Sequence, residues 1–227
     1  MSKKTAASPK LERLERERKQ RRRAIISVAR RFFAKQGYDQ AMVDEIAQAA
    51  GYTKMTIYNY FESKDDLFIA VVSEAYQKLY EMMKSHLGRE DVSFELRSMG
   101  NAYLSFFETY PDDAILFESG RLGVVISKIV RKREKEEALT ESELEFSSHM
   151  ALLEEFMTSV IQETLRNSGI PDRVDPFGVI MVLSTFAQTI RELVIRGKRS
   201  GQSQAKSKEY LSVFFNIIDQ GLKHYDG

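Results

Sequence analysis

Residues 53–60 carry side chains suited to contact with a polyanion. Within eight positions the segment holds two threonines, a lysine, an asparagine and two tyrosines. Hydroxyl, amide and ammonium groups are the types that bind base edges and phosphate oxygens of DNA. The predicted DNA contacts within this segment are Thr53, Lys54, Met55, Thr56, Tyr58, Asn59 and Tyr60.

Two short predicted helices position these side chains. The first covers residues 43–50, and the small Ala47 and Ala50 allow a second helix to cross it closely. Gly51 suits a tight turn, and Thr53 can cap the following helix at residues 54–60. Ile57 and Phe61 are four residues apart and are expected to face the core. The pattern predicts a helix-turn-helix over residues 44–61, or else a three-helix structural domain with incidental tyrosines.

The flanking segments complete an N-terminal domain. Apolar residues at helical spacing predict a helix over residues 21–36, which Gly37 ends, and a longer helix over residues 64–85. Residues 1–23 hold ten Lys and Arg against three Glu. We therefore expect residues 1–20 to form a basic arm, disordered or helical. It is either a solvated charged face or an arm that touches DNA phosphates or the minor groove.

The rest of the chain also has a helical pattern, with no sustained alternation of apolar and polar residues. Helices are predicted over residues 92–109, 112–136, 142–168, 175–197 and 206–223. The fold class is therefore all-α: a helix-turn-helix domain over residues 21–82 joined to a regulatory and dimerisation domain over residues 83–227. Residues 1–85 carry a net charge of +6 and the remainder −5, which favours a polyanion partner for the first part over chance clustering.

Composition argues against several other classes of protein. The chain has no cysteine, no glycine-rich phosphate loop, and only three histidines, His86, His149 and His224, none at metal-ligand spacing. We therefore predict that it is not an enzyme and that it has no cofactor and no metal site. It has no apolar run of the length that crosses a bilayer and no secretory signal, so a cytoplasmic protein without membrane contact is expected.

The segment GYDQAMVDEIAQAAGYTKMTIYNYFESKDDL resembles the N-terminal domain of TetR/AcrR-type regulators. The shared positions are Ile46-Ala47 with Ala50-Gly51, then Thr53, Tyr58 with Phe61, and Lys64 with Leu67. The resemblance covers residues 22–82. It implies that residues 53–56 meet bases, that Tyr58 and Tyr60 meet phosphates with Asn59 between them, and that Lys64 meets the backbone.

Two positions depart from the family pattern. Met42 stands where the family usually has a threonine that caps the second helix and contacts phosphate. Met55 stands where glycine or alanine is common, and could contact a thymine methyl or alter the preferred operator. Both departures concern the DNA sequence that is recognised and leave the scaffold unchanged.

The C-terminal half is predicted to form a homodimer and to enclose an effector. The helices near residues 175–197 and 206–223 are apolar on nearly all sides, so they require cover from a second copy or from complete burial within one subunit. Aromatic and methionine residues at helical spacing are either plain core or walls of a ligand cavity, with Arg121 and His149 as possible polar anchors. The candidate ligand residues are Tyr103, Phe106, Phe107, Tyr110, Phe117, Phe146, Met150 and Phe156.

These observations predict a dimeric, sequence-specific regulator that binds a double-stranded DNA operator and is released from it by a small, largely apolar effector. Repression is assigned by analogy with the family. The alternative is an architectural or cell-division factor that uses the same fold without a small-molecule effector.

Overall fold

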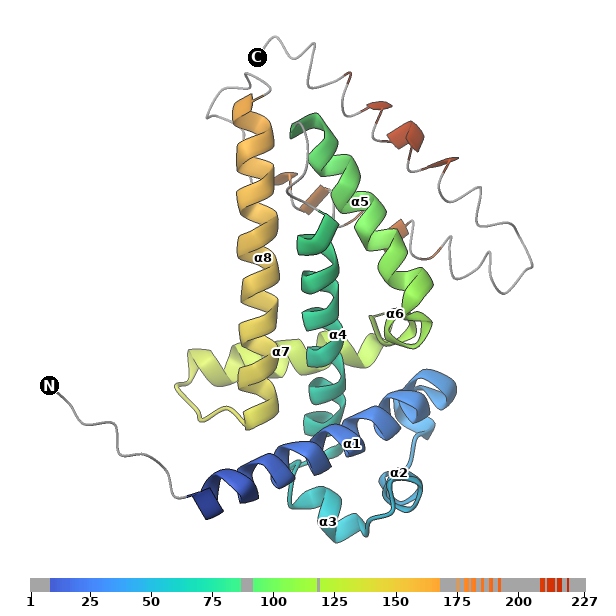
Figure 1. Ribbon diagram of the computed structural model, residues 1–227, viewed down its shortest axis with the longest axis vertical. Helices are drawn as coiled ribbons and strands as arrows, with labels where there is room; N and C mark the ends of the chain where they lie inside the picture. The colour runs from blue at the N-terminus through green and yellow to red at the C-terminus, as the bar shows by residue number, and fades with distance from the viewer. Residues whose placement is uncertain are drawn as a thin grey trace, which may run out of the picture. The chain divides into compact units, whose positions relative to one another are not determined.

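The computed structural model describes residues 9–86, 92–117 and 119–167, together with scattered positions between 175 and 220 (Figure 1). Within these residues the chain forms helices and contains no strand, which confirms the predicted all-α fold. None of the described helices is both long enough and apolar enough to cross a membrane. The predicted helices over residues 175–197 and 206–223 lie largely outside the described residues.

The helices agree with the predicted elements in most places. The predicted helices at 43–50 and 92–109 are confirmed, whereas the single helix expected over residues 112–136 is wrong. This stretch contains two helices instead. The Ser119 hydroxyl accepts a hydrogen bond from the Arg121 amide, at 3.3 Å, and so caps a new helix. The elements are α1 Pro9–Gln40, α2 Val43–Ala50, α3 Lys54–Tyr58, α4 Lys64–His86, α5 Val92–Thr109, α6 Pro111–Phe117, α7 Gly120–Glu134 and α8 Glu141–Asn167.

The chain groups into two compact units. The first unit comprises residues 1–73 and 115–146, and the second comprises residues 74–114 and 147–227. Helices α4 and α8 each contribute residues to both units. The division expected at residue 83 concerns function, and it stays a prediction because compact units need not coincide with functional domains.

The core of the first unit is built from one face of each of its N-terminal helices. Ile25 of α1, Ile46 of α2, Ile57 of α3 and Leu67 of α4 are each at most 1% exposed. Gly37 has a φ of 78°, which interrupts the helical geometry of α1 and confirms the predicted stop there. Residues 1–8 of the predicted arm lie outside the described residues, and residues 9–20 are helical.

The second unit packs the later turns of α4 against α5 and α8, which run side by side in Figure 1. Its buried residues include Leu79 of α4, Phe106 of α5 and Ile161 of α8. Tyr80 of α4 meets Phe156 of α8 edge to face, with ring centroids 5.6 Å apart. This arrangement gives the second unit an apolar interior lined by aromatic rings.

Gly51, which lies between α2 and α3, has a φ of 76°, in the left-handed region that residues with a side chain avoid. We predict that Gly51→Ala lowers the free energy of unfolding by about 1 kcal/mol. Gly123 is the matched control, because it is helical and no atom lies within 4 Å of an added Cβ. Gly123→Ala should instead raise stability by about 0.5–1 kcal/mol. Urea unfolding measures both changes, and equal effects would contradict the role given to Gly51.

Candidate nucleic-acid interface

The turn between α2 and α3 is built as the sequence predicts. The amide of Gly51 donates to the carbonyl oxygens at the end of α2, where the left-handed glycine closes the helix. The Thr53 hydroxyl accepts a hydrogen bond from the Thr56 amide, at 3.2 Å, and so caps α3. Met42 precedes α2 and makes no side-chain cap, which confirms the departure noted at that position.

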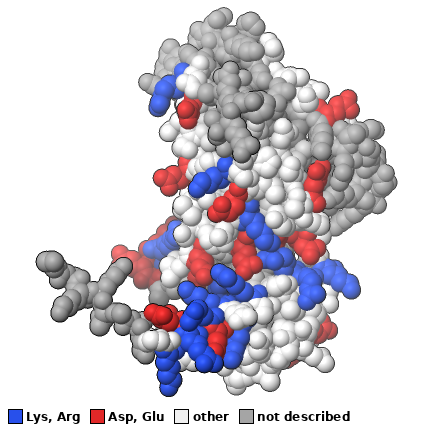
Figure 2. Space-filling view, viewed as in Figure 1, with Lys and Arg blue, Asp and Glu red and all other residues white. Residues whose placement is uncertain are grey.

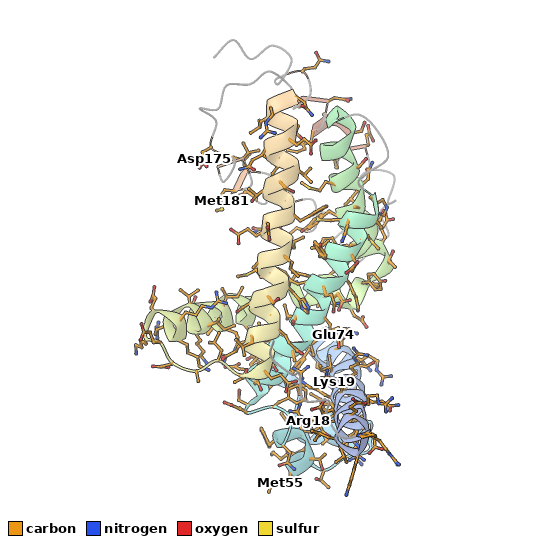
Figure 3. All side chains as sticks on the ribbon, turned by 60° about the vertical axis from the view of Figure 1, so that its left-hand side comes forward. Arg18, Lys19, Met55, Glu74, Asp175 and Met181 are labelled. Carbon is orange, nitrogen blue, oxygen red and sulfur yellow. The ribbon has the colours of Figure 1, made fainter. Side chains whose placement is uncertain are left out.

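Helix α3 is fixed by its buried side and presents the remaining side chains outward. Ile57 and Phe61 are each 1% exposed, whereas Met55 is 72% exposed. Figure 3 shows Met55 at the outer end of the unit, directed away from the core. Thr56 and Tyr60 are half-buried, and the exposed predicted contacts are Thr53, Lys54, Met55, Tyr58 and Asn59. The helix therefore offers a polar surface with one long apolar side chain at its centre.

Two cations next to α3 are held by carboxylates. The Lys54 ammonium lies 2.8 Å from an oxygen of Asp44 in α2, and both side chains are exposed. The hydrogen bond to Asp44 raises the pKa of Lys54. The Arg18 guanidinium of α1 lies over the Tyr60 ring, 5.6 Å from its centroid, and forms an ion pair with Glu141 at 2.9 Å. Helices α1 and α3 therefore each bring a cation to this surface, and each cation is paired with a carboxylate.

Lys64 occupies a more enclosed position than a free phosphate-binding lysine. Its ammonium donates to the backbone carbonyl of Asp39, at 3.2 Å, and lies 4.4 Å from the centroid of the Tyr38 ring. Burial lowers the pKa of Lys64 from its ordinary value. Tyr38 and the carbonyl of Asp39 therefore fix the position of the Lys64 ammonium. No sequence motif indicates this role for Tyr38.

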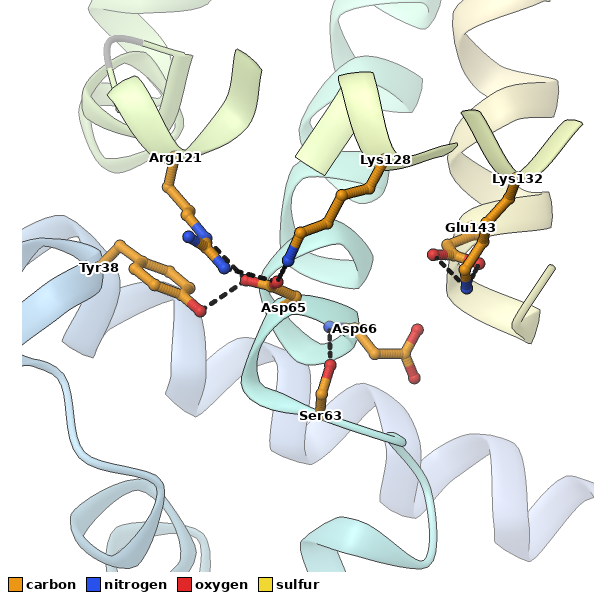
Figure 4. Close-up of polar contacts among 8 residues, drawn as sticks. All are labelled: Tyr38, Ser63, Asp65, Asp66, Arg121, Lys128, Lys132 and Glu143. Carbon is orange, nitrogen blue, oxygen red and sulfur yellow. Dashed lines mark hydrogen bonds and ion pairs between the residues drawn. The ribbon is translucent and has the colours of Figure 1, made fainter. Parts of the chain in front are cut away.

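Asp65, in the first turn of α4, binds three side chains of the first unit (Figure 4). Its carboxylate accepts from the Tyr38 hydroxyl at 2.6 Å and from the Lys128 ammonium at 2.7 Å. Two nitrogens of the Arg121 guanidinium donate to it, at 2.8 and 2.6 Å. Burial alone would raise the pKa of Asp65, but the hydrogen bonds from Arg121, Lys128 and Tyr38 outweigh it and hold this pKa well below its usual range.

The same network perturbs Tyr38. Burial, followed by the hydrogen bond to Asp65, raises the pKa of the Tyr38 hydroxyl, so this hydroxyl stays protonated and donates. The Arg121 guanidinium lies 4.8 Å from the centroid of the Tyr38 ring. Arg121 thus belongs to the first unit as a partner of Asp65 and Tyr38.

Two further contacts tie the start of α8 and the loop before it to the helix-turn-helix. The Thr140 hydroxyl donates to Asp66, whose other carboxylate oxygen accepts from the Glu62 amide at 2.9 Å. Arg22 of α1 is buried and lies 2.8 Å from a carboxylate oxygen of Glu145. These contacts therefore join α1, α4, α7 and the start of α8 within the first unit, although the residues are far apart in the sequence.

The candidate ligand residues fall into both units. Four lie together in the second unit, three on α5 and Tyr110 directly after it: Tyr103 meets Phe107 with ring centroids 4.6 Å apart, and Phe106 meets Tyr110 at 5.4 Å. Phe106 and Phe107 are at most 1% exposed. Met150 and Phe156 are half-buried residues of α8 in the second unit, whereas Phe117 and Phe146 belong to the first unit. Their assignment to a ligand cavity stays a prediction.

A capped two-helix turn with an exposed polar second helix defines a helix-turn-helix DNA-binding domain. The sequence profile described as "Bacterial regulatory proteins, tetR family" matches residues 25–71. Residues 25–71 therefore form a DNA-binding domain of the TetR type, as the resemblance of the N-terminal sequence indicates. That family consists of regulatory proteins, which agrees with the expectation that the chain is not an enzyme.

Curated relatives match only part of the chain. The chain is 42% identical over 59 residues to the HTH-type transcriptional repressor Rv1474c of Mycobacterium tuberculosis, a match covering 26% of this chain and 32% of the relative. It is 32% identical over 85 residues to the HTH-type transcriptional regulator AcrR of Shigella flexneri, covering 37% of this chain and 36% of the relative. These matches thus span about a third of the length of each relative.

A solved structure extends the similarity in fold to the second half of the chain. The transcriptional regulator FadR of Bacillus subtilis, solved in complex with stearoyl-CoA, aligns with a TM-score of 0.60 and 18% identity. The alignment covers 88% of this chain and 97% of that protein. At this identity the likeness describes the fold alone.

The Asp65 network leads to a stability prediction. Because its folded-state pKa is depressed, the carboxylate stabilises the protein above its unfolded pKa of about 4, and this contribution is lost as the pH falls further. We expect Asp65→Asn to lower the free energy of unfolding at pH 7 by about 2 kcal/mol and to flatten the loss of stability in acid. Urea unfolding from pH 7 to 3 measures both effects.

Glu17→Gln is the matched control, since Glu17 forms an exposed ion pair with Arg13 at 2.8 Å. Its effect at pH 7 should be much smaller than that of Asp65→Asn, because water screens an exposed pair. An Asp65→Asn protein as stable as the control protein would contradict the role given to the network.

Proposed function

We propose that this chain is a dimeric, sequence-specific DNA-binding transcriptional regulator, and specifically a repressor that a small, largely apolar effector releases from its operator. The exposed face of α3 carries this proposal. Ile57 and Phe61 fix the helix from its buried side, so the outward side chains have defined directions. A helix held in this way can enter the major groove and read base edges.

The individual side chains support different kinds of contact. Thr53, Lys54 and Met55 lie at the first turn of α3, the part of a recognition helix that meets bases. Tyr58 and Asn59, at its other end, suit phosphate oxygens. Met55 adds an apolar group that fits against a thymine methyl, and the operator preference is expected to depend on it.

Apolar surface in the C-terminal part supports assembly into a homodimer. Met181 and Val182 are 53% and 64% exposed, and Val213 and Ile217 are 52% and 66% exposed. All four are helical residues within the segments 175–197 and 206–223. A second copy that covers these faces removes the apolar surface from water. The two recognition helices of such a dimer would meet half-sites about 34–36 Å apart.

The interior of the second unit supports an apolar effector. Aromatic rings of α5 and α8 line it, and FadR of Bacillus subtilis, with which this chain shares its fold, was solved with stearoyl-CoA. A long-chain acyl thioester is therefore the first effector to try. Since α4 contributes to both units, an effector that favours one position of α4 would shift the population of DNA-binding states.

We predict that the protein selects a palindromic sequence from random DNA and binds it as two chains per duplex. Mobility shifts over a range of salt concentrations, with the stoichiometry from sedimentation, measure this. Specific binding should persist against a scrambled duplex, and stearoyl-CoA should lower the bound fraction. Equal affinity for operator and scrambled DNA at every salt concentration would contradict the proposal.

We predict that Tyr58→Phe weakens operator binding by about threefold to tenfold, because one hydrogen bond to phosphate is lost. Lys64→Ala should weaken binding on all sequences and lower the slope of log K against log salt by about one per half-site. Arg166→Ala, which removes an exposed cation of α8 in the second unit, is the control and should change neither. Unchanged affinity in both test variants would mean that this docking arrangement is wrong.

A further inference from the structure

The first turns of α1 extend the DNA-binding unit beyond its family pattern. Helix α1 begins at Pro9, whereas the family profile matches only from residue 25. Residues 1–23 hold ten Lys and Arg against three Glu. Figure 2 shows Lys and Arg side chains gathered over the part of the first unit that α1 occupies. Eight of these cations lie within residues 9–23, so the first turns of α1 carry a concentration of positive charge.

Several of these cations already have acidic partners. Arg18 pairs with Glu141 at 2.9 Å, and Arg13 pairs with Glu17 at 2.8 Å. Lys10 and Arg21 are exposed, and within the described part of the chain neither has a carboxylate within ion-pair distance. Lys19 and Arg23 are exposed and unpaired in the same sense. Two Lys–Arg pairs on one helix are thus available for an external anion.

The contact between α1 and Tyr60 distinguishes these two pairs. The Arg18 guanidinium lies over the Tyr60 ring, so the Arg18 side of α1 is the side next to the end of α3. Residues three or four, and seven or eight, positions apart share a helix face, which places Lys10 and Arg21 on that side. At about 100° per residue, Lys19 and Arg23 point to the opposite side of Arg18 from Lys10 and Arg21. Figure 3 shows Arg18 nearer than Lys19 to the end of the unit that carries Met55.

We infer that Lys10 and Arg21 bind backbone phosphates of the DNA that flanks the half-site read by α3. The inference rests on the proposed function, because it requires α3 to be in the major groove. A rigid helix carrying cations about three turns apart, beside the recognition helix, complements the regular negative charge of a duplex. Such contacts add affinity without adding sequence preference. The α1 extension thus lengthens the footprint beyond the bases that α3 reads.

The test compares two double variants of the full-length chain on the selected operator. Lys10→Gln with Arg21→Gln removes the proposed contacts, whereas Lys19→Gln with Arg23→Gln removes the same charge from another side of α1. The first variant should lower the slope of log K against log salt by about two per half-site, and the second should leave it unchanged. The wild type should bind a duplex trimmed of its flanking base pairs less tightly than the full duplex. The first variant should bind both duplexes with equal affinity.

The outcomes separate the inference from the proposed function. A wild type that selects no operator would overturn the proposed function itself. If both variants bind the operator with the wild-type salt slope, the proposed phosphate contacts are overturned. If both variants lower the slope equally, the contacts of Lys10 and Arg21 are also overturned, because charge on any side of α1 then has the same effect. Thermal unfolding of each variant checks that α1 is intact, and Gln at all four positions preserves helix propensity.

Discussion

The geometry of the DNA-binding unit depends on one carboxylate, that of Asp65. It lies in the first turn of α4, where free backbone amides favour negative charge, and it accepts hydrogen bonds from the end of α1 and from two positions of α7. Withdrawing a carboxylate from water is unfavourable unless cations and donors replace the lost solvent. Arg121, Lys128 and Tyr38 meet that requirement together, and they fix the start of α4 relative to α1 and α7.

The local features of the helix-turn-helix could be predicted from the sequence because short-range physics determines them. Gly51 ends α2 because a left-handed residue is needed there, and Thr53 caps α3 with its own hydroxyl. The spacing of Ile57 and Phe61 identifies the buried side of the helix. The helical pattern over residues 112–136 does not indicate the break between α6 and α7, although Ser119 before a glycine is a usable capping signal.

The polar network could not be predicted, because its partners are remote in sequence. Asp65 is 27 residues from Tyr38, 56 from Arg121 and 63 from Lys128. No periodicity or local motif relates such positions. The aromatic residues of α5 illustrate a different limit: helical spacing predicts that they face inward, but plain core and a ligand wall produce the same spacing. Phe106 and Phe107 are buried, which both interpretations require.

The compact unit around the helix-turn-helix is assembled from two separate stretches of chain, residues 1–73 and 115–146. Moving the recognition helix from one protein to another, in evolution or by engineering, therefore involves both stretches. A recombination event with a crossover after Asp65 and before α5 would transfer Asp65 without Arg121 and Lys128, and so leave a carboxylate without its cations. A chimera that keeps its operator preference should therefore inherit the α7 segment together with the recognition helix.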